Sequence, residues 1–508
     1  MRVSKTLLIF GVSLLLFAWS GCNPDMNVEN QNAPETERAL SNPEDVEALV
    51  GGAYLTFFEV QMKSYPGMAL STAADELTSS WGNFHMRWAS TEPRIEYDNS
   101  PTYSYNNFTE TPWYDLYSVI STANDALKLL DGGMKMATEA RTARARAFAK
   151  FLQGASHGFL ALFFDKAFIF DETVDLETDK LEFSPYSDVM TAAISQLEAA
   201  AALFEAGTAD VPSEWINGLT VSSSDMAKLV HSYIARYLAS VARTPADREA
   251  VDWNRVISHI DKGVTEDFAP EGDGIFWWAR HFYQGQHPVW VRADNKTVGL
   301  ADTSGNYEAW LATPVADRQP FLIHTADKRI TDGNPEGVGL DFRYAGTPRH
   351  RPDRGTYHFS FYFNQRFEYH FLNDATGPMP MVTTREMDLL KAEALFRLNQ
   401  GGVADLINKT RVPRGGLPPV SDSDADLWDK LVYEKKIECF LAGSAGLAFW
   451  DARGWDKLVS GTPYHWPVPG LELEILLEPY YTFGGPGGKD TVPKTMQRRH
   501  EPLEVDPF

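Results

Sequence analysis

Apolar side chains recur at helical spacing over most of the chain. The clearest run begins at Phe148 and places apolar residues 3, 4, 7, 11, 14 and 15 positions further on, which corresponds to one face of an α-helix. Spacing and composition predict further helices at residues 43–61, 113–127, 186–205, 226–241, 253–264, 387–398 and about 424–440. The protein is therefore predicted to be mainly α-helical.

The order of these helices suggests how they pack. Successive amphipathic helices of roughly 20 residues, joined by short turns, indicate stacked helix pairs, because one pair cannot bury its apolar face alone. The tetratricopeptide (TPR) stack is the closest known arrangement, although no clean 34-residue consensus repeats here. We expect TPR-like stacked helix pairs with a degenerate repeat.

Two stretches break the helical pattern. Residues 81–112 are polar and aromatic, and residues 271–380 are long and irregular, with alternation of aromatic residues near 357–363 that predicts short strands or extended loops. Ordered loops of this length are usually functional. We therefore expect a loop-rich half that binds a ligand. The last fifty residues are rich in Pro and Gly and are expected to cover the core as coil.

The N-terminus has the pattern of a cleaved, lipid-modified leader. Arg2 and Lys5 precede the apolar run 7–19, and Ser20 and Gly21 stand directly before Cys22. The run is short for a bilayer span and ends in small residues, so residues 1–21 are predicted to be a signal peptide. The small pair before Cys22 looks like a bacterial lipobox, although Trp19 stands where an aliphatic residue is usual. We predict acylation of Cys22 and a flexible tether over 22–40; the alternative is an ordinary secreted protein with an incidental cysteine.

The composition of the chain argues against two classes of binding partner. The chain has 46 basic and 69 acidic residues, a formal net charge of −23, which argues against binding nucleic acid or docking on anionic lipid through a basic patch. Aromatic residues make up 13% and include 14 Trp, so some rings are expected to bind a ligand. With Cys22 acylated, Cys439 has no partner, and its apolar surroundings predict a small core residue.

Three segments partly resemble enzyme motifs, but each lacks a residue or a structural context that its motif requires. His500-Glu501 lacks the second His of a zinc helix, and the Gly-rich segment 484–490 has Asp490 where a phosphate loop needs Ser or Thr. Residues 442–446 loosely resemble a nucleophile elbow but follow a helix rather than a strand. No carboxylate pair is marked as that of a glycosidase. We predict no enzyme activity, no cofactor and no metal site.

Segments 45–54, 113–127, 226–238, 379–418, 434–453 and 466–473 carry a series of motifs that, taken together, resemble the SusD/RagB outer-membrane lipoproteins of Bacteroidota-type bacteria. The similarity covers nearly the whole mature chain and is most specific at 379–418, where Arg385, Glu393, Ala394, Asn408, Arg411 and the Gly416-Leu417-Pro418 turn hold the family's places. Further matches are at 45–54, 113–127 and 226–238, in the helix with Glu434 and Glu438, in Trp450-Asp451 with Arg453, and at 466–473.

The resemblance implies a TPR-like scaffold with an irregular binding half and a location at the cell outer membrane. It also implies a partner, a TonB-dependent (SusC-like) transporter barrel that the lipoprotein covers as a lid. The usual cargo of the family is a glycan, and some members take peptides. We divide the mature chain into a helical N-terminal part, 41–270, and a C-terminal part, 271–508, packed closely on the first.

Glycan binding needs flat rings for sugar faces and a few polar groups for hydroxyls. The two irregular stretches supply this mixture, and the predicted ligand-binding residues are Trp81, Asn83, Arg87, Trp88, Trp277, Trp278, Tyr283, Trp290 and Trp310. The competing interpretation is that most of these rings belong to the core. The family-motif residues Arg385, Glu434, Glu438, Asp451 and Arg453 are predicted to be structural, mostly in ion pairs.

The function predicted from the sequence is capture of a nutrient, most readily an oligo- or polysaccharide, and its delivery to the transporter. Two alternatives remain open at this point: a secreted helical glycoside hydrolase or lyase, and a scaffold for protein interactions only.

Overall fold

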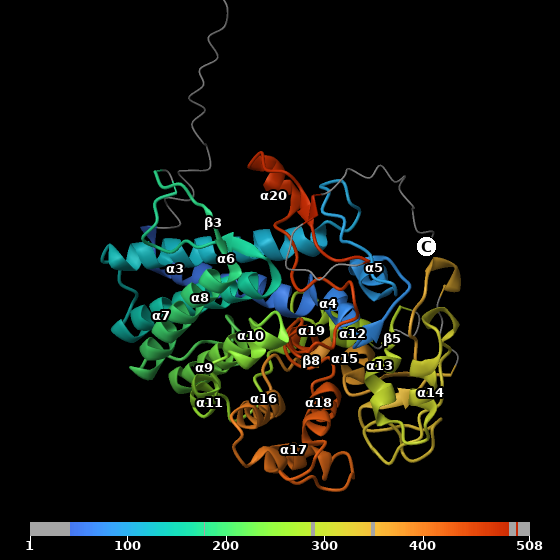
Figure 1. The fold of residues 1–508 in the computed structure, drawn as a ribbon. Helices are drawn as coiled ribbons and strands as arrows, with labels where there is room; N and C mark the ends of the chain where they lie inside the picture. Colours follow the sequence, from blue (N-terminus) through green and yellow to red (C-terminus); the bar gives the residue numbers. More distant parts are fainter. Residues whose placement is uncertain (1–40, 177, 286–289, 347–350, 487–493, 496–508) are drawn as a thin grey trace, which may run out of the picture.

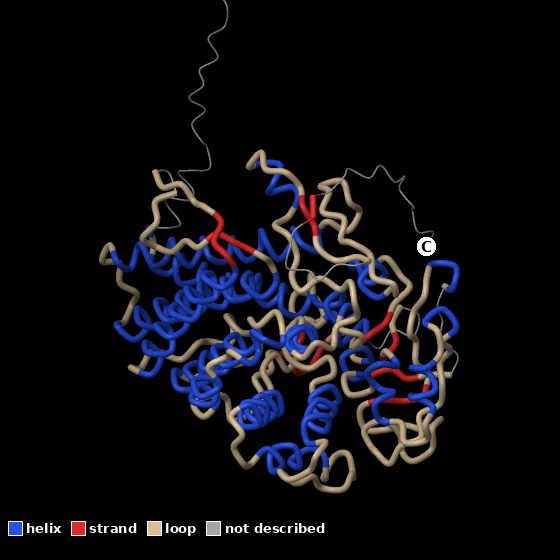
Figure 2. Tube along the Cα trace, in the orientation of Figure 1, coloured by secondary structure: helices blue, strands red, loops and turns tan. Residues whose placement is uncertain are grey.

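The computed structural model describes residues 41–176, 178–285, 290–346, 351–486 and 494–495. Helices dominate this part of the chain, and short strands lie between them (Figure 1 and Figure 2). The predicted signal peptide, Cys22 and the tether at 22–40 lie outside the described residues. No helix within the described ranges has the length and apolar character that crossing a membrane requires.

The helices and strands have the following bounds. The α-helices are α3 (Pro43–Phe58), α4 (Gly67–Ala73), α5 (Met86–Ser90), α6 (Asn107–Asp131), α7 (Glu139–Phe163), α8 (Tyr186–Glu205), α9 (Ser223–Ser240), α10 (Pro245–Glu249), α11 (Trp253–Ile260), α12 (Arg280–Gly285), α13 (Asn295–Val298), α14 (Asn306–Ala312), α15 (Glu368–Leu372), α16 (Thr384–Arg397), α17 (Val403–Arg411), α18 (Leu427–Glu438), α19 (Leu447–Gly454) and α20 (Gly470–Ile475). A π-helical turn, η1 (Glu59–Lys63), extends α3, and the 3-10 turns are η2 (Asn83–His85), η3 (Gly299–Ala301), η4 (Val315–Asp317) and η5 (Pro352–Arg354). The strands pair two by two and antiparallel: β1 (Leu77–Thr78) with β5 (Arg292–Ala293), β2 (Lys166–Phe168) with β3 (Phe183–Pro185), β4 (Glu271–Asp273) with β8 (Thr376–Pro378), β6 (Phe342–Tyr344) with β7 (Tyr362–Asn364), and β9 (Tyr481–Thr482) with β10 (Lys494–Thr495).

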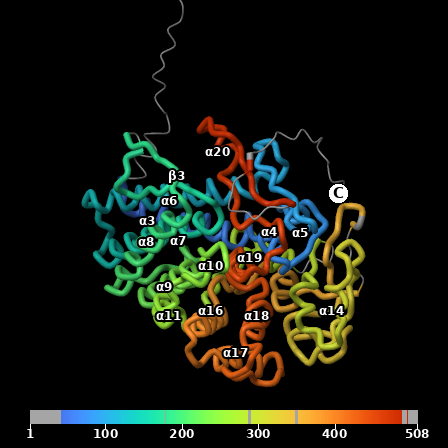
Figure 3. Tube along the Cα trace, viewed as in Figure 1, coloured from blue at the N-terminus to red at the C-terminus, as the bar shows by residue number. Residues whose placement is uncertain are grey.

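The long helices form a stack of neighbours. α6 packs on α7, α7 on α8, α8 on α9, α9 on α11, α11 on α16, and α16 on both α17 and α18. In Figure 3 this series runs as an arc from the cyan helices α6 and α7 through green α8 and α9 to orange α16 and α17. The predicted mainly α fold of stacked helix pairs is confirmed.

The long irregular stretch is an insertion into this stack. The chain leaves after α11, which ends at Ile260, and returns with α16, which begins at Thr384 and packs directly on α11. The intervening residues carry α12 to α15. α12 packs on η1 and α4, whereas α13 and α14, yellow in Figure 1, lie to one side of the stack. The division of the chain at 270 and 271 stays a prediction.

The predicted apolar face of α7 is buried. Phe148, Phe151, Leu152, Phe159 and Phe163 are all 1% exposed or less. Polar residues on the opposite side of the second half of α7, such as Gln153 and His157, are buried as well, because α6, α8 and α9 all pack on this helix. α7 is thus the central helix of the first half.

The C-terminal stretch covers the core as expected but is not coil throughout. The Trp466 ring stacks on Phe163 at 4.9 Å, and Val468 is fully buried. The helix α20 follows Pro469, with Glu472 in its first turn where the helix dipole favours an acid.

The family-motif charges are structural. Glu434 and Glu438 on α18 are fully buried and receive the Arg329 guanidinium at 2.5 and 2.9 Å, and Arg385 reaches Glu438 at 3.4 Å. Asp451 pairs with Lys435 at 2.8 Å. Arg453 differs from the expectation of an ion pair, because it donates to backbone carbonyls, including that of Leu162 at 2.9 Å. Cys439 is buried in the cluster of α16–α18, and burial raises the pKa of its thiol, as expected of a core residue.

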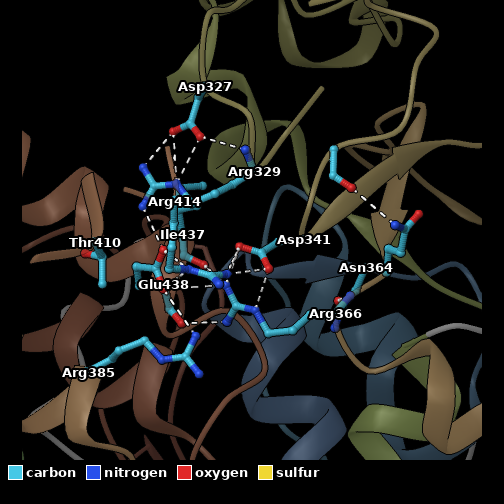
Figure 4. Close-up of polar contacts among 12 residues, drawn as sticks. Asp327, Arg329, Asp341, Asn364, Arg366, Arg385, Thr410, Arg414, Ile437 and Glu438 are labelled. Atoms are coloured by element: carbon cyan, nitrogen blue, oxygen red, sulfur yellow. Dashed lines mark hydrogen bonds and ion pairs between the residues drawn. The ribbon is translucent and has the colours of Figure 1, made fainter. Parts of the chain in front are cut away.

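These charges also attach the insertion to the stack. Asp327, Arg329, Asp341 and Arg366 come from the insertion, and Figure 4 shows them gathered near Glu438, with the Asp327 carboxylate bound to Arg329. Arg366 binds Asp341 at 2.7 Å and donates to the backbone carbonyl of Glu438 at 2.6 Å. The arginines beside Asp341 lower the pKa of its carboxyl to about 2, so it stays charged. The irregular half is therefore held in one position.

Candidate ligand-binding surface

The two irregular stretches meet at the strand pair β1–β5. Leu77 faces Ala293 and Thr78 faces Arg292 in antiparallel register, so the residues after β1 lie beside those before β5. The Ser79 hydroxyl donates to the backbone carbonyl of Trp290 at 2.7 Å and accepts from the backbone N–H of Trp81 at 3.2 Å. Trp81 and Trp290, more than 200 residues apart in sequence, thus lie at the same end of this strand pair.

A strained turn follows Trp81. Phe84 and His85 have φ angles of 59° and 66°, in the left-handed region that non-glycine residues rarely occupy. Two such residues cost on the order of 1–3 kcal/mol each, so their surroundings must hold them there. The buried His85 ring stacks on Phe108 at 4.8 Å, and its Nδ1 lies 2.8 Å from the Tyr103 hydroxyl. Burial lowers the pKa of His85 to about 3, so the ring is neutral at physiological pH.

A glycine lets two rings close on this turn. A Cβ atom on Gly82 would lie 2.4 Å from the Tyr105 hydroxyl and 3.0 Å from Cη2 of Trp88, which is closer than packed atoms allow. The Trp88 and Tyr105 rings are 4.9 Å apart and are both half-buried. Gly82 is therefore needed for the approach of these rings to the backbone.

Arginines and aromatic rings contact one another in a series around this turn. The Arg354 guanidinium lies 5.1 Å from the Trp81 ring, and Arg87 lies 5.4 Å from Trp88 and donates to the Arg354 carbonyl at 3.3 Å. On the other side, Phe84 lies 6.4 Å from Trp290.

Beyond Phe84 the same series continues onto α12. Arg280 lies between Phe84, at 4.3 Å, and Trp278, at 4.7 Å, and the Tyr283 ring is 5.9 Å from Trp278. Burial lowers the pKa of Arg280 to about 10, which leaves it charged at neutral pH. We call this set the aromatic surface: Trp81, Phe84, Arg87, Trp88, Tyr105, Trp278, Arg280, Tyr283, Trp290 and Arg354. All ten side chains are half-buried.

Most of the predicted binding residues lie together in the structure. Trp81, Arg87, Trp88, Trp278, Tyr283 and Trp290 come together in the aromatic surface. Asn83 is the first residue of η2, half-buried within the same turn.

Trp277 and Trp310 are corrections to the prediction. Trp277 is 8% exposed, packed 4.6 Å from Phe58 of α3, and Trp310 is 5% exposed, covered by Arg318 at 4.4 Å and His358 at 5.0 Å. Neither ring has a free face for a ligand, so both belong to the core.

Sequence reasoning missed Phe84, Tyr105, Arg280 and Arg354. Phe84 and Tyr105 lie within the irregular stretch 81–112 that was singled out, and Arg280 lies between Trp278 and Tyr283. The aromatic content of that stretch was the available signal for Phe84 and Tyr105, and the two flanking rings were the signal for Arg280. Arg354, between Asp353 and Gly355, carried no such signal.

The surface offers binding groups rather than reactive ones. Indole and phenol faces present flat apolar area, and the guanidinium groups between them donate hydrogen bonds. Among the described residues, no three His, Cys, Asp or Glu side chains gather in a way that could hold a metal ion.

Solved structures with the same fold include proteins described as SusD superfamily or SusD-like. A SusD superfamily protein from Parabacteroides distasonis has a TM-score of 0.59 and 15% sequence identity, covering 85% of this chain and 97% of its own. A SusD-like carbohydrate binding protein from Bacteroides fragilis has a TM-score of 0.57 and 15% identity, covering 84% and 90%. A second SusD-like carbohydrate binding protein, from Bacteroides vulgatus, has a TM-score of 0.53 and 15% identity, covering 83% and 86%. No protein-family profile and no curated sequence matches the chain.

These likenesses define the class of the fold. The chain has the SusD-like fold over more than four fifths of its length, which confirms the fold that the motifs at 379–418 and 434–453 predicted. At 15% identity the likeness concerns the fold alone.

Proposed function

We propose that the protein binds a glycan on the aromatic surface and performs no chemistry on it. The observation that carries the proposal is the series of half-buried rings and arginines that contact one another from Tyr283 to Trp290 and from Trp81 to Trp88, with Ser79 joining the two parts. Sugar rings have an apolar face and a rim of hydroxyls, which such a surface matches. Two proteins of the same fold are described as carbohydrate binding, which supports the choice of ligand.

The strained turn at Phe84 and His85 supports the same site. Backbone strain of this kind clusters at ligand sites, where the surrounding packing holds it. Here the neutral His85 ring holds the turn from inside while Phe84 joins the surface between Trp290 and Arg280. The site is thus fixed before a ligand arrives, which reduces the entropy lost on binding.

Replacing Trp81 and Trp290 together by Ala is expected to abolish glycan retention. Native gels cast with amylopectin, xylan, pectin or dextran should retard the wild-type protein with at least one polymer, and the double variant should migrate as in a plain gel. Loss of two stacking rings corresponds to about 2–3 kcal/mol, or roughly a hundredfold in affinity.

A matched control is Trp428→Ala, which removes a half-buried indole packed on Phe396 at 5.1 Å, far from this surface. The control should be retarded as the wild type is, provided that circular dichroism shows all variants folded. Unchanged retardation of the Trp81 and Trp290 double variant would remove the site. Release of reducing sugar would favour the hydrolase or lyase alternative.

We also propose that the protein is anchored in the outer membrane through lipid on Cys22 and delivers its ligand to a TonB-dependent transporter. The leader pattern before Cys22 and the resemblance to the SusD/RagB lipoproteins support this. Several acyl chains on one cysteine give stable anchoring. The net charge of −23 argues against attachment to anionic lipid through a basic patch, so the lipid on Cys22 is the proposed anchor.

Replacing Cys22 by Ser is expected to release the protein from the membrane. In cells given an alkyne-tagged palmitate, the wild type should be labelled and Cys22→Ser should not. The wild type should be found in the outer-membrane fraction and co-purify with a barrel transporter. The variant should be absent from that fraction. Cys439→Ser is the control, because the buried thiol is shielded from acylation. Equal labelling of wild type and Cys22→Ser would refute the anchor, and wild type recovered without a barrel would refute the partnership.

A further inference from the structure

A cavity of about 560 Å³ lies at the other end of the β1–β5 pair. Asp75 precedes β1 and Lys296 follows β5, so both lie opposite to the Trp81 and Trp290 end of this antiparallel pair. The cavity is bounded by α13, η3 and α14 on one side and by α17 and α18 on the other. Its volume is in the range of small-molecule sites. It shares none of its lining residues with the aromatic surface.

The charge of the lining is opposite to that of the protein. The cations that line the cavity are Lys296, Arg411, Lys430, Lys436 and Lys457, against the anions Asp75 and Asp429. The whole chain has a net charge of −23. A cluster of positive charge in an acidic protein is therefore a local feature that composition does not explain.

Of the five cations, two have carboxylate partners, two lack them, and Arg411 donates to the backbone carbonyl of Pro418 at 2.8 Å. Lys296 binds Glu92 at 2.6 Å, and Lys430 binds Asp424 at 2.9 Å. Across the part of the chain that the structure describes, Lys436 and Lys457 have no carboxylate within ion-pair distance. Both lysines line the cavity.

Lys436 is half-buried, so its unmatched charge is costly. Burial lowers the pKa of its ammonium group. Asp75, Asp294 and Glu76 raise this pKa, although none of them is close enough to form an ion pair with Lys436. Asp75 is already engaged by Arg94 at 2.7 Å.

The other two carboxyls are poor counterions. Burial raises the pKa of Glu76 to about 7, and burial together with the neighbouring Asp75 holds the pKa of Asp294 well above its usual range. Neither group supplies a full negative charge to Lys436 at neutral pH. A bound anion would supply it.

Most of the other side chains that line the cavity are apolar or aromatic and could contact the apolar part of a small organic molecule. Leu300, Leu311, Leu417 and Val432 give apolar area. The Tyr307 ring, stacked on Trp310 at 6.0 Å, adds a flat face.

We propose that this cavity is a second ligand site that binds a small organic anion, with its carboxylate between Lys436 and Lys457 and its body against Leu300, Tyr307 and Val432. The anionic group replaces the counterion that these two lysines lack. The apolar walls favour a ring-sized carboxylate over a bare inorganic ion. This site is independent of glycan binding on the aromatic surface.

Isothermal titration of the full mature chain tests the proposal with matched probes. Benzoate and glucuronate are the carboxylates, benzyl alcohol and glucose their neutral counterparts, and inorganic phosphate the bare anion. At least one carboxylate should bind about tenfold more tightly than its neutral counterpart, and its affinity should fall with added salt.

Substitutions then locate the binding. Lys436→Gln and Lys457→Gln should each weaken carboxylate binding by at least about fivefold, and Lys457→Glu by more. Lys180→Gln, which removes a lysine that is 87% exposed elsewhere, should leave it unchanged. Lys457 is exposed, so its variants test the site even if Lys436→Gln fails to fold.

Three results would overturn the proposal. These are no carboxylate binding at millimolar concentration, binding that is insensitive to both lysines, and phosphate binding as tight as that of the carboxylates. Binding lost with the Trp81 and Trp290 double variant but kept in the lysine variants would assign the carboxylate to the aromatic surface instead.

Discussion

Replacing Arg329 by Met is expected to lower the free energy of unfolding by about 3–5 kcal/mol, because the change leaves buried carboxylates without their cation. Arg329, Asp327, Glu434 and Glu438 are all fully buried. Glu438 keeps Arg414 at 3.0 Å, and Asp327 keeps the Tyr433 hydroxyl and the backbone N–H of residue 329. Glu434 retains the Thr410 hydroxyl but no cation. Urea unfolding followed by circular dichroism measures the loss.

The loss in Arg329→Met should depend on pH with a definite sign. Burial already raises the pKa of Glu434 while Arg329 opposes this. Without Arg329 the pKa of Glu434 in the folded state rises further above its value in the unfolded state. Protonation of Glu434 therefore stabilises the folded variant at low pH, and this contribution is lost as the pH rises. The gap between wild type and variant should be smaller near pH 5 than at pH 8.

The control for this variant is Lys409→Met. Its pair with Asp388 is exposed, with the lysine side chain 54% accessible, and such pairs contribute about 1 kcal/mol or less. A loss in Arg329→Met no greater than in Lys409→Met, or a gap that widens at low pH, would contradict the account of the buried network.

Replacing Gly154 by Val is expected to destabilise the helix stack by about 3 kcal/mol or more, and Gly154→Ala by about 1–3 kcal/mol. A Cβ on Gly154 would lie 2.9 Å from both the Ala193 carbonyl oxygen and the Leu197 backbone nitrogen of α8. Backbone atoms cannot move aside as a flexible side chain can, so α7 and α8 would separate. Thermal unfolding followed by circular dichroism measures the effect.

Gly52→Ala is the matched control, because Gly52 is also inside a helix but has nothing within 4 Å of the added Cβ. Ala in place of Gly within a helix should stabilise the protein by about 0.5–1 kcal/mol. The two alanine variants should therefore shift the unfolding midpoint in opposite directions. A raised midpoint in both would show that helix propensity, and not the close approach of α7 and α8, decides the effect.

The helices could be predicted well because their signal is local. The apolar spacing from Phe148 onward identified α7, and the boundaries predicted at 186–205 coincide with α8. The close approach at Gly154 could not be predicted, since a glycine within a helix pattern says nothing about which helix lies against it.

The candidate site could be predicted in part. The irregular stretches 81–112 and 271–380 contain the aromatic surface, and six of the nine predicted residues contribute to it. Trp277 and Trp278 are neighbours in sequence, yet the first packs on Phe58 of α3 and the second lies beside Arg280. The side chains of these two neighbours point to different sides of the backbone, and the position of α3 decides that the Trp277 side is buried.

The sequence by itself determined the helical character, the positions of most helices and the segments that break the pattern, because these depend on residues within a few turns of each other. Tertiary structure decided that α11 and α16 pack together across the insertion, that β1 brings Trp81 to Trp290, and that Arg329 is the cation of Glu434. Each of these contacts joins residues about a hundred or more positions apart. Such pairings follow from how whole surfaces fit together, which no local pattern records.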